Sequence, residues 1–263
     1  MLKNIFGKTL FERKMVILEW FAATLVVLFG TAMIFPGIRD SFGTVMGTMP
    51  DSMKGWMGTT DSWSTYNGYA GQELFHQMVI LPSIAMILFG ANFLAGEEGS
   101  TLLLTTLSKP LKRYNLYLQK YFALVVTLFA IMAGYFLGII LGGIALGESI
   151  NYQAMLQSTL VATLLALVLG TLSFCLGAAT GKKSIAGVVV GFYAFLSYFI
   201  ASLSTAGDIV DKISYATVFR YFVPHDIMAG NFDVNNVFIL LAIIIVPHFI
   251  ALPIFAKRDL LTR

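Results

Sequence analysis

The sequence predicts an all-α integral membrane protein with six transmembrane helices, and three observations lead to this fold class. First, 57% of the 263 residues are hydrophobic and only 12% are Asp, Glu, Lys or Arg, whereas an average soluble domain has about 25% charged residues. Second, six apolar stretches have the roughly 20 residues that a helix needs to cross the hydrocarbon core. Third, basic residues are concentrated in alternate segments between these stretches. Together they exclude a soluble enzyme, a disordered chain and a nucleic-acid-binding protein.

The six predicted spans lie at residues 15–36, 75–95, 121–146, 155–180, 185–206 and 237–256. The first is too long for the apolar region of a cleavable signal peptide, and the residues after it lack a cleavage pattern of small side chains. Few residues remain outside the spans to build a soluble domain. We therefore predict that residues 1–263 form a single transmembrane domain.

The basic residues predict the orientation, because Lys and Arg accumulate in the short cytoplasmic loops of membrane proteins. If the N-terminus is cytoplasmic, most of the 17 Lys and Arg residues lie on the cytoplasmic side, and the exceptions are Arg39, Lys54, Lys212 and Arg220. We therefore expect both termini in the cytoplasm, a long cytoplasmic loop at residues 96–120 and a short one at residues 181–184.

The long cytoplasmic loop contains the most informative segment of the chain, residues 96–113. Glu97 and Glu98 come near its start, and acidic side chains favour the N-terminal end of a helix, where the dipole is positive. Leucines then recur at helical spacing as far as Pro110, which disfavours helical geometry in the residue before it. We predict a short amphipathic cytoplasmic helix. It either only connects two spans or docks a soluble partner, with its charged ends setting the register.

The same segment resembles the signature of type-2 ABC transporter permeases, the membrane subunits of ATP-driven exporters. That signature has an acidic pair, Gly-Thr, a Leu-rich turn, Ser-x-Pro and a basic residue, followed by a Lys that opens the next span. The matching residues are Glu97, Glu98, Gly99, Thr101, Leu103, Leu104, Ser108, Pro110, Arg113 and Lys120. This chain departs from the signature by an inserted Ser100 and by Leu111-Lys112 before Arg113. Residues 49–69 and 255–260 are also similar to the family, so the resemblance covers nearly the whole chain.

The resemblance implies a function, partners and site residues. Such a permease forms the translocation pathway as a dimer with a second permease subunit, identical or paralogous, and two copies of a separate ATPase subunit bind ATP and Mg²⁺. The predicted helix would be the coupling helix seated on the ATPase, and its coupling residues would be Glu97, Glu98, Gly99, Thr101, Leu104, Leu107, Lys109, Pro110 and Arg113. The exported compound would be amphipathic or hydrophobic, such as a peptide, drug or lipid. The location would be a bacterial or archaeal cell membrane.

No residue pattern in the chain predicts an enzyme, a cofactor or a metal site. Residues 177–184 are similar to a phosphate-binding loop, but the glycines are one residue too close and Lys183 replaces the hydroxyl that binds magnesium. We therefore expect a tight basic turn there and ATP hydrolysis on a separate chain. The alternative function is an ion-coupled secondary transporter without an ATPase partner.

Two ionisable residues, Glu19 and His248, lie inside predicted spans. Ionisable side chains are rare at membrane depth and can line a transport pathway. The simpler interpretation is that Glu19 reaches the membrane interface and that His248 bonds to a neighbouring helix.

Glycines recur every four residues in the third predicted span, at Gly134, Gly138 and Gly142, and in the fifth, at Gly187 and Gly191. Small residues at this spacing allow two helices to approach closely. The pattern fits packing within the subunit and dimerisation equally well.

Overall fold

The computed structural model describes residues 5–45, 63–98, 112–204 and 207–258, and it confirms the predicted fold class. In these residues helices are the only regular secondary structure, and six of them are long and apolar enough to cross a membrane. The six spans are Ile5–Ser41, Tyr66–Phe93, Arg113–Ala145, Tyr152–Thr180, Lys183–Ser202 and Val234–Lys257.

The spans are divided into helices, some of which are short. The elements in chain order are α1 (Ile5–Met33), α2 (Phe35–Val45), α5 (Tyr66–Tyr69), η2 (Ala70–Gln77), α6 (Ile80–Phe93), α7 (Ala95–Glu98), α9 (Arg113–Ala145), α10 (Tyr152–Thr180), α11 (Lys183–Ser202), α12 (Asp208–Ser214), η4 (Val218–Tyr221), α13 (Pro224–Met228) and α14 (Val234–Lys257). Of these, η2 is a π-helix and η4 a 3₁₀-helix.

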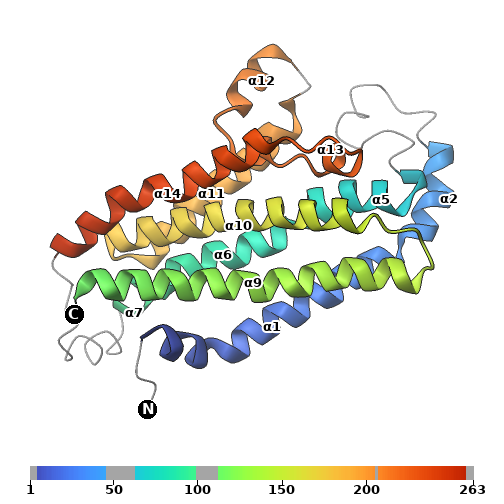
Figure 1. The fold of residues 1–263 in the computed structure, drawn as a ribbon. Helices are drawn as coiled ribbons and strands as arrows, with labels where there is room; N and C mark the ends of the chain where they lie inside the picture. Colours follow the sequence, from blue (N-terminus) through green and yellow to red (C-terminus); the bar gives the residue numbers. More distant parts are fainter. Residues whose placement is uncertain (1–4, 46–62, 99–111, 205–206, 259–263) are drawn as a thin grey trace.

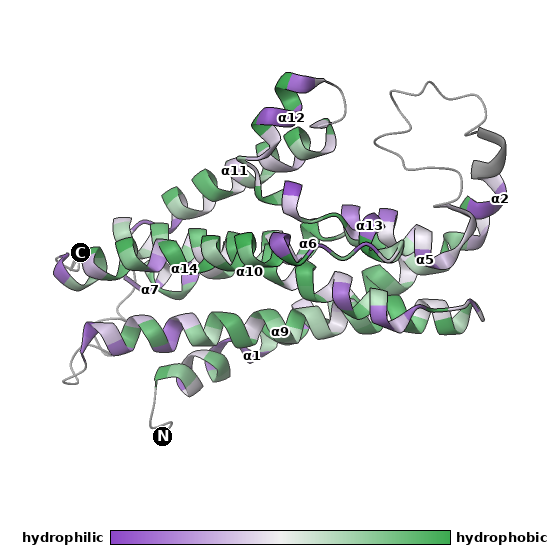
Figure 2. Cartoon of the chain, turned by 45° about the horizontal axis from the view of Figure 1, so that its top comes forward, coloured by the Kyte–Doolittle hydropathy of each residue, from purple (hydrophilic) through white to green (hydrophobic). Residues whose placement is uncertain are grey.

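The long helices form two groups, and both chain termini lie at the same end of the bundle (Figure 1). One group, the α1–α9 pair, consists of two helices packed along most of their length. The other, the α10 group, consists of α6, α10, α11 and α14, with α10 in extensive contact with α6 and α14. Hydrophobic residues follow the length of the long helices, and hydrophilic residues gather towards the helix ends (Figure 2).

The first three spans begin earlier than the sequence predicts. The α1 helix begins at Ile5 instead of residue 15, the second span at Tyr66 instead of 75, and α9 at Arg113 instead of 121. The sequence prediction counts consecutive apolar residues, whereas a helix continues through charged turns as long as its backbone hydrogen bonds are made. These extra turns place charged side chains at the ends of the bundle.

The three glycines that recur every four residues in α9 lie against α1 and serve packing within the chain. A Cβ atom added at Gly138 would lie 2.6 Å from the carbonyl oxygen of Leu25 and 2.9 Å from the Cβ of Leu28. The Thr24 hydroxyl donates a hydrogen bond across the same contact to the carbonyl oxygen of Ile131, at 3.1 Å. In α11, by contrast, Gly191 has no atom within 4 Å of an added Cβ among the described residues.

The second span starts with a feature that the sequence prediction missed, the eight-residue π-helix η2. Its wider turns carry polar side chains, and the Gln77 side chain donates to the carboxylate of Glu73 at 2.6 Å. The buried Tyr135 hydroxyl of α9 donates to the carbonyl oxygen of Leu74 and holds η2 in place. π-Helical turns inside α-helices are frequent at functional sites.

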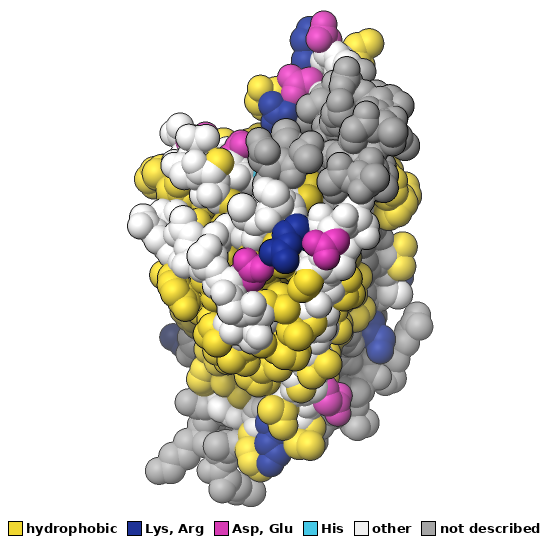
Figure 3. Space-filling model, turned by 90° about the vertical axis from the view of Figure 1, so that its right-hand side faces the viewer, with side chains coloured by type: hydrophobic (Ala, Val, Ile, Leu, Met, Phe, Trp, Pro, Cys, Tyr) yellow, Lys and Arg dark blue, Asp and Glu magenta, His cyan; other side chains and the backbone are white. Residues whose placement is uncertain are grey.

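At the end of the bundle remote from the termini, the described residues include charged side chains of both signs. Figure 3 views this end, where the charged side chains lie among uncharged polar ones and hydrophobic side chains surround them. Arg39 of α2 lies 3.0 Å from Glu148 and 3.8 Å from Asp40, so its charge is balanced locally.

Candidate functional site

The predicted coupling residues lie partly outside the described part of the chain. Gly99, Thr101, Leu104, Leu107, Lys109 and Pro110, with the predicted amphipathic helix, are outside the described residues. Glu97, Glu98 and Arg113 are described, and they lie at the end of the bundle that carries the termini (Figure 1). These three residues and their partners Arg13, Lys120 and Arg258 form what we call the ion-pair cluster.

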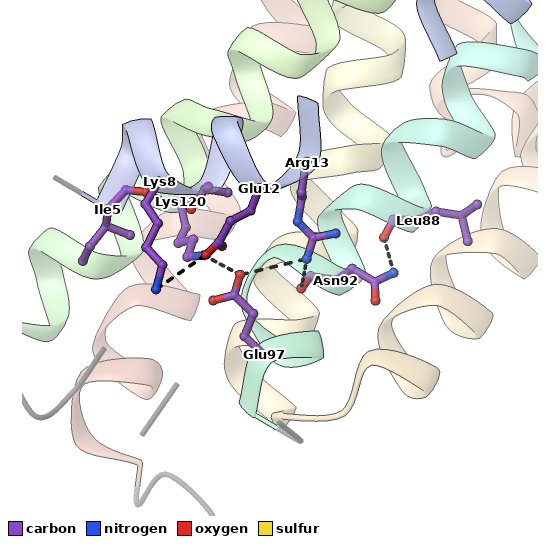
Figure 4. Close-up of polar contacts among 9 residues, drawn as sticks. Ile5, Lys8, Glu12, Arg13, Leu88, Asn92, Glu97 and Lys120 are labelled. Carbon is purple, nitrogen blue, oxygen red and sulfur yellow. Dashed lines mark hydrogen bonds and ion pairs between the residues drawn. The ribbon is translucent and has the colours of Figure 1, made fainter. Parts of the chain in front are cut away.

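Glu97 of α7 binds two basic side chains from the α1–α9 pair (Figure 4). Its carboxylate accepts a hydrogen bond from the ammonium of Lys120 at 2.5 Å, and the guanidinium of Arg13 lies 3.9 Å away. Lys120 is only 3% exposed. Because a buried ammonium needs a charged partner, Glu97 compensates the charge of Lys120 and fixes α7 to the α1–α9 pair.

Glu98 is directed to the α10 group instead. Its carboxylate accepts a hydrogen bond from the guanidinium of Arg258, just after α14. Arg113, the first residue of α9, donates to the carbonyl oxygens of Ala256 at 3.2 Å and Arg258 at 2.5 Å. Burial raises the pKa of the Glu98 carboxyl more than the neighbouring Arg258 and Arg113 lower it. Adjacent glutamates therefore hold different helix groups.

The turn between α10 and α11 packs against the Glu98–Arg258 pair. Gly181 has a φ angle of +70°, and a Cβ added there would lie 2.6 Å from a carboxylate oxygen of Glu98 and 2.9 Å from Cζ of Arg258. With α11 starting at Lys183, the connection is the tight turn that the sequence predicts. A side chain at position 181 would displace the ion pair.

Replacing Gly181 by alanine is therefore expected to lower the free energy of unfolding by roughly 2 kcal/mol or more, from a strained left-handed backbone and a displaced Arg258. Gly147 is a matched control, since its φ is +68° and nothing lies within 4 Å of an added Cβ. We expect Gly147→Ala to lower the free energy of unfolding by only about 1 kcal/mol, the cost of a left-handed backbone at a residue with a side chain. Thermal unfolding in detergent measures the difference, and equal losses would contradict the crowding at Gly181.

The two possible pathway residues lie in different surroundings. Glu19 is exposed on α1 and forms no hydrogen bond or ion pair with the described residues. The Nδ1 atom of His248 in α14 shares a hydrogen bond with the Tyr117 hydroxyl of α9 at 2.7 Å. Its ring meets the edge of Tyr121 at a centroid distance of 4.2 Å. The expected bond from His248 to a neighbouring helix is confirmed.

Metal-binding groups are also absent from the described residues, in which no three His, Cys, Asp or Glu side chains are grouped as metal ligands. The single cysteine, Cys175, is buried, and its sulfur lies 3.4 Å from the hydroxyl of Tyr117. The ion-pair cluster joins helices through charged hydrogen bonds.

Comparison with known proteins agrees with the architecture. The family model for "ABC-2 family transporter protein" matches residues 12–260, from α1 to beyond the end of α14. No curated protein matches the chain.

Proposed function

Because the chain belongs to the ABC-2 transporter family, we propose that it is the permease subunit of an ATP-driven exporter. The observation that carries this proposal is a family match spanning all of the helices from α1 to α14. Two permease subunits, identical or paralogous, enclose the translocation pathway in a bacterial or archaeal cell membrane. Two copies of a separate ATPase subunit bind and hydrolyse ATP with Mg²⁺. The exported compound is amphipathic or hydrophobic, of the peptide, drug or lipid class.

The ATPase subunits bind the end of the bundle that carries the termini, and this end faces the cytoplasm. The distribution of basic residues supports this orientation. Lys and Arg gather at that end, whereas Arg39 at the other end is balanced by Asp40 and Glu148. Lys182 and Lys183 add positive charge at the turn between α10 and α11.

We infer from the contacts of the ion-pair cluster that a movement of the ATPase is transmitted through them to the transmembrane spans. Residues 99–111 are bracketed by Glu98 and Arg113, and both of these side chains bind the end of α14. Glu97 binds the α1–α9 pair. A displacement of this segment is thereby transmitted to both helix groups, which move as rigid bodies. Glu97 and Glu98 act as positioning residues, and the contact with the ATPase is made by the leucines that follow.

Changing Leu104 and Leu107 to aspartate is expected to release the ATPase without unfolding the permease, because both leucines belong to the predicted docking stripe. Central apolar contacts in an interface are worth about 2 kcal/mol or more, which corresponds to a roughly 30-fold loss of affinity. The measurement is the amount of ATPase chain recovered with tagged permease in mild detergent. Thr105→Asp, in the same segment but on the other face of the predicted helix, is the control and should retain the ATPase.

Two outcomes would contradict the proposal. Unchanged ATPase recovery by the double variant would remove the coupling role of the leucines. If no ATP-hydrolysing chain is recovered with the unmodified permease, and transport by reconstituted protein needs an ion gradient instead of ATP, the chain is an ion-coupled secondary transporter.

A further inference from the structure

A cavity of about 510 Å³ lies towards the end of the bundle remote from the termini. We call it the distal cavity. Gln72 and His76 of η2 form one side, and the other sides come from the end of α11, from η4, from α13 and from the start of α14. Its volume falls within the range of small-molecule sites, about 300–1,000 Å³.

Aromatic rings form part of the wall, and contacts within the chain hold them in place. Tyr215, Phe219, Tyr221 and Phe222 line the distal cavity. Phe219 packs edge-on against Tyr198 of α11 at a centroid distance of 5.4 Å, and the Tyr221 hydroxyl donates to the carbonyl oxygen of Tyr215 at 2.7 Å. Such rings offer apolar surface and can also attract a cation through their faces.

The charges on the wall are unequal. Among the described residues, Arg220 is the one Lys or Arg that lines the distal cavity, and its guanidinium lies 2.6 Å from the carboxylate of Asp211 and over the ring of Tyr215. Asp226 and Asp233 also line the cavity. The carboxylate of Asp226 lies 3.3 Å from Nε2 of His225, and no described Lys or Arg pairs with either acid. The negative charge on the wall therefore exceeds the positive charge.

The carboxylates of Asp226 and Asp233 also face a second, smaller cavity of about 110 Å³. The two cavities share Tyr221, Asp226, Asp233 and Asn236, and the smaller one adds apolar side chains from Val161, Ile227 and Phe232. The acids are thus placed where two partly apolar spaces meet. A ligand whose positive centre is surrounded by apolar groups fits this arrangement.

We propose that the distal cavity binds an amphiphilic organic cation and that this is the class of compound which the protein exports. The aromatic wall receives the apolar part, while Asp226 and Asp233 balance the positive charge. An anion of the same shape would meet two carboxylates without a matching cation. The role as an exit site rests on the proposed function, whereas binding itself requires neither ATP nor the ATPase.

Tetraphenylphosphonium and tetraphenylborate test the proposal, because they have the same shape and opposite charges. Binding of each is measured by equilibrium dialysis with the full-length permease in lipid nanodiscs, without ATP, at pH 8, where histidine side chains are in general uncharged. Empty nanodiscs give the partition into lipid. We expect saturable binding of the cation above this background and no saturable binding of the anion.

The carboxylates are tested by the double variant Asp226→Asn and Asp233→Asn, which should weaken cation binding about tenfold. Asp233 caps α14 by accepting from the backbone N–H of Asn235, and asparagine caps helices equally well. The control is Asp40→Asn with Asp208→Asn, which removes the same charge from two exposed acids outside the cavity. It should leave the affinity within about twofold of the unmodified protein.

A bulky residue in the wall tests the location. Ala201→Trp places a large side chain in the cavity from the end of α11, and it should abolish saturable binding without changing the elution volume of the protein. Equal binding of cation and anion, or an unchanged affinity in the acid double variant, would overturn the proposal. Recovery of the ATPase chain is measured separately, so the permease assignment can stand if the substrate class fails.

Discussion

Replacing Glu97 by glutamine should lower the free energy of unfolding by about 3–5 kcal/mol, because it leaves the ammonium of Lys120 buried without its carboxylate. Lys120 is 3% exposed. Arg13, which approaches the same carboxylate, cannot balance the charge of Lys120, and Glu12 attracts Lys120 more weakly than Glu97 does. The loss corresponds to a fall in unfolding temperature of roughly 10 °C for a chain of this size. Fluorescence-detected unfolding of the purified protein in detergent measures it.

A second change in the same protein separates charge from packing. When Lys120→Met accompanies Glu97→Gln, no buried ammonium remains, and Arg13 is partly exposed and keeps its hydrogen bond to the carbonyl oxygen of Asn92. Replacing a buried ion pair by apolar groups is often neutral. We expect the double variant to recover most of the lost stability. Asp40→Asn is the control, because its pair with Arg39 is more than 40% exposed and such surface pairs contribute less than about 1 kcal/mol. A double variant no more stable than Glu97→Gln would contradict this account.

The rescued double variant also separates stability from coupling. If Glu97 transmits movement to the α1–α9 pair, the variant will fold and retain the ATPase but will hydrolyse ATP without transport. Transport at the unmodified rate would show that the ion pair is structural only.

The second large effect is expected at Gly138, where α9 touches α1. An added Cβ lies 2.6 Å from the carbonyl oxygen of Leu25, so Gly138→Ala should cost about 1–3 kcal/mol by overpacking, and Gly138→Leu should abolish the folded monomer. Gly30 lies on α1 with nothing within 4 Å of an added Cβ. Gly30→Ala should therefore be neutral or slightly stabilising, since alanine is the better helix former.

The same thermal unfolding assay measures both variants, and size-exclusion chromatography reports whether the protein remains folded and monodisperse. The free energy of unfolding should fall for Gly138→Ala and stay the same or rise for Gly30→Ala, and this difference in direction is what tests the close contact. A similar loss at Gly30 and Gly138 would mean that any change in these helices is harmful and that the close contact with Leu25 is not the cause.

The sequence predicts the spans well because each depends on a local property, a run of apolar residues. It places the starts of α1 and α9 too late because charged turns such as the one with Arg113 belong to the helix but not to the apolar run. It also misses η2, since a segment of eight residues has too few apolar positions to distinguish a π-helical from an α-helical period. These errors concern the ends of helices, where the functional residues lie.

Sequence patterns do not predict which residues Glu97 and Glu98 bind. Glu97 pairs with Lys120 across a loop, and Glu98 pairs with Arg258 from the other side of four spans. The motif indicates that Glu97 and Glu98 matter, but it suggests contact with another protein. Only the tertiary packing shows that the two carboxylates are directed into the chain, towards different helix groups.

The distal cavity is likewise a product of tertiary structure. Gln72 and His76 come from η2, whereas all its other lining residues lie between positions 201 and 236, more than 120 residues later. Asp226 and Asp233 belong to the connection between the fifth and sixth predicted spans, where no sequence pattern identifies them as site residues. Their proximity to the rings of Tyr215 and Tyr221 depends on how this loop folds back between α11 and α14.

The different sequence separations of the two acidic contacts set the order in which a newly made chain can complete them. Lys120 follows Glu97 by 23 residues, so this contact can form as soon as α9 has entered the membrane from the translocation machinery. Arg258 follows Glu98 by 160 residues, and the ribosome must first deliver α10, α11 and α14. Until then the carboxylate of Glu98 stays accessible to water. Of the two neighbouring glutamates, Glu97 can therefore form its ion pair early in biogenesis, whereas Glu98 forms its ion pair late.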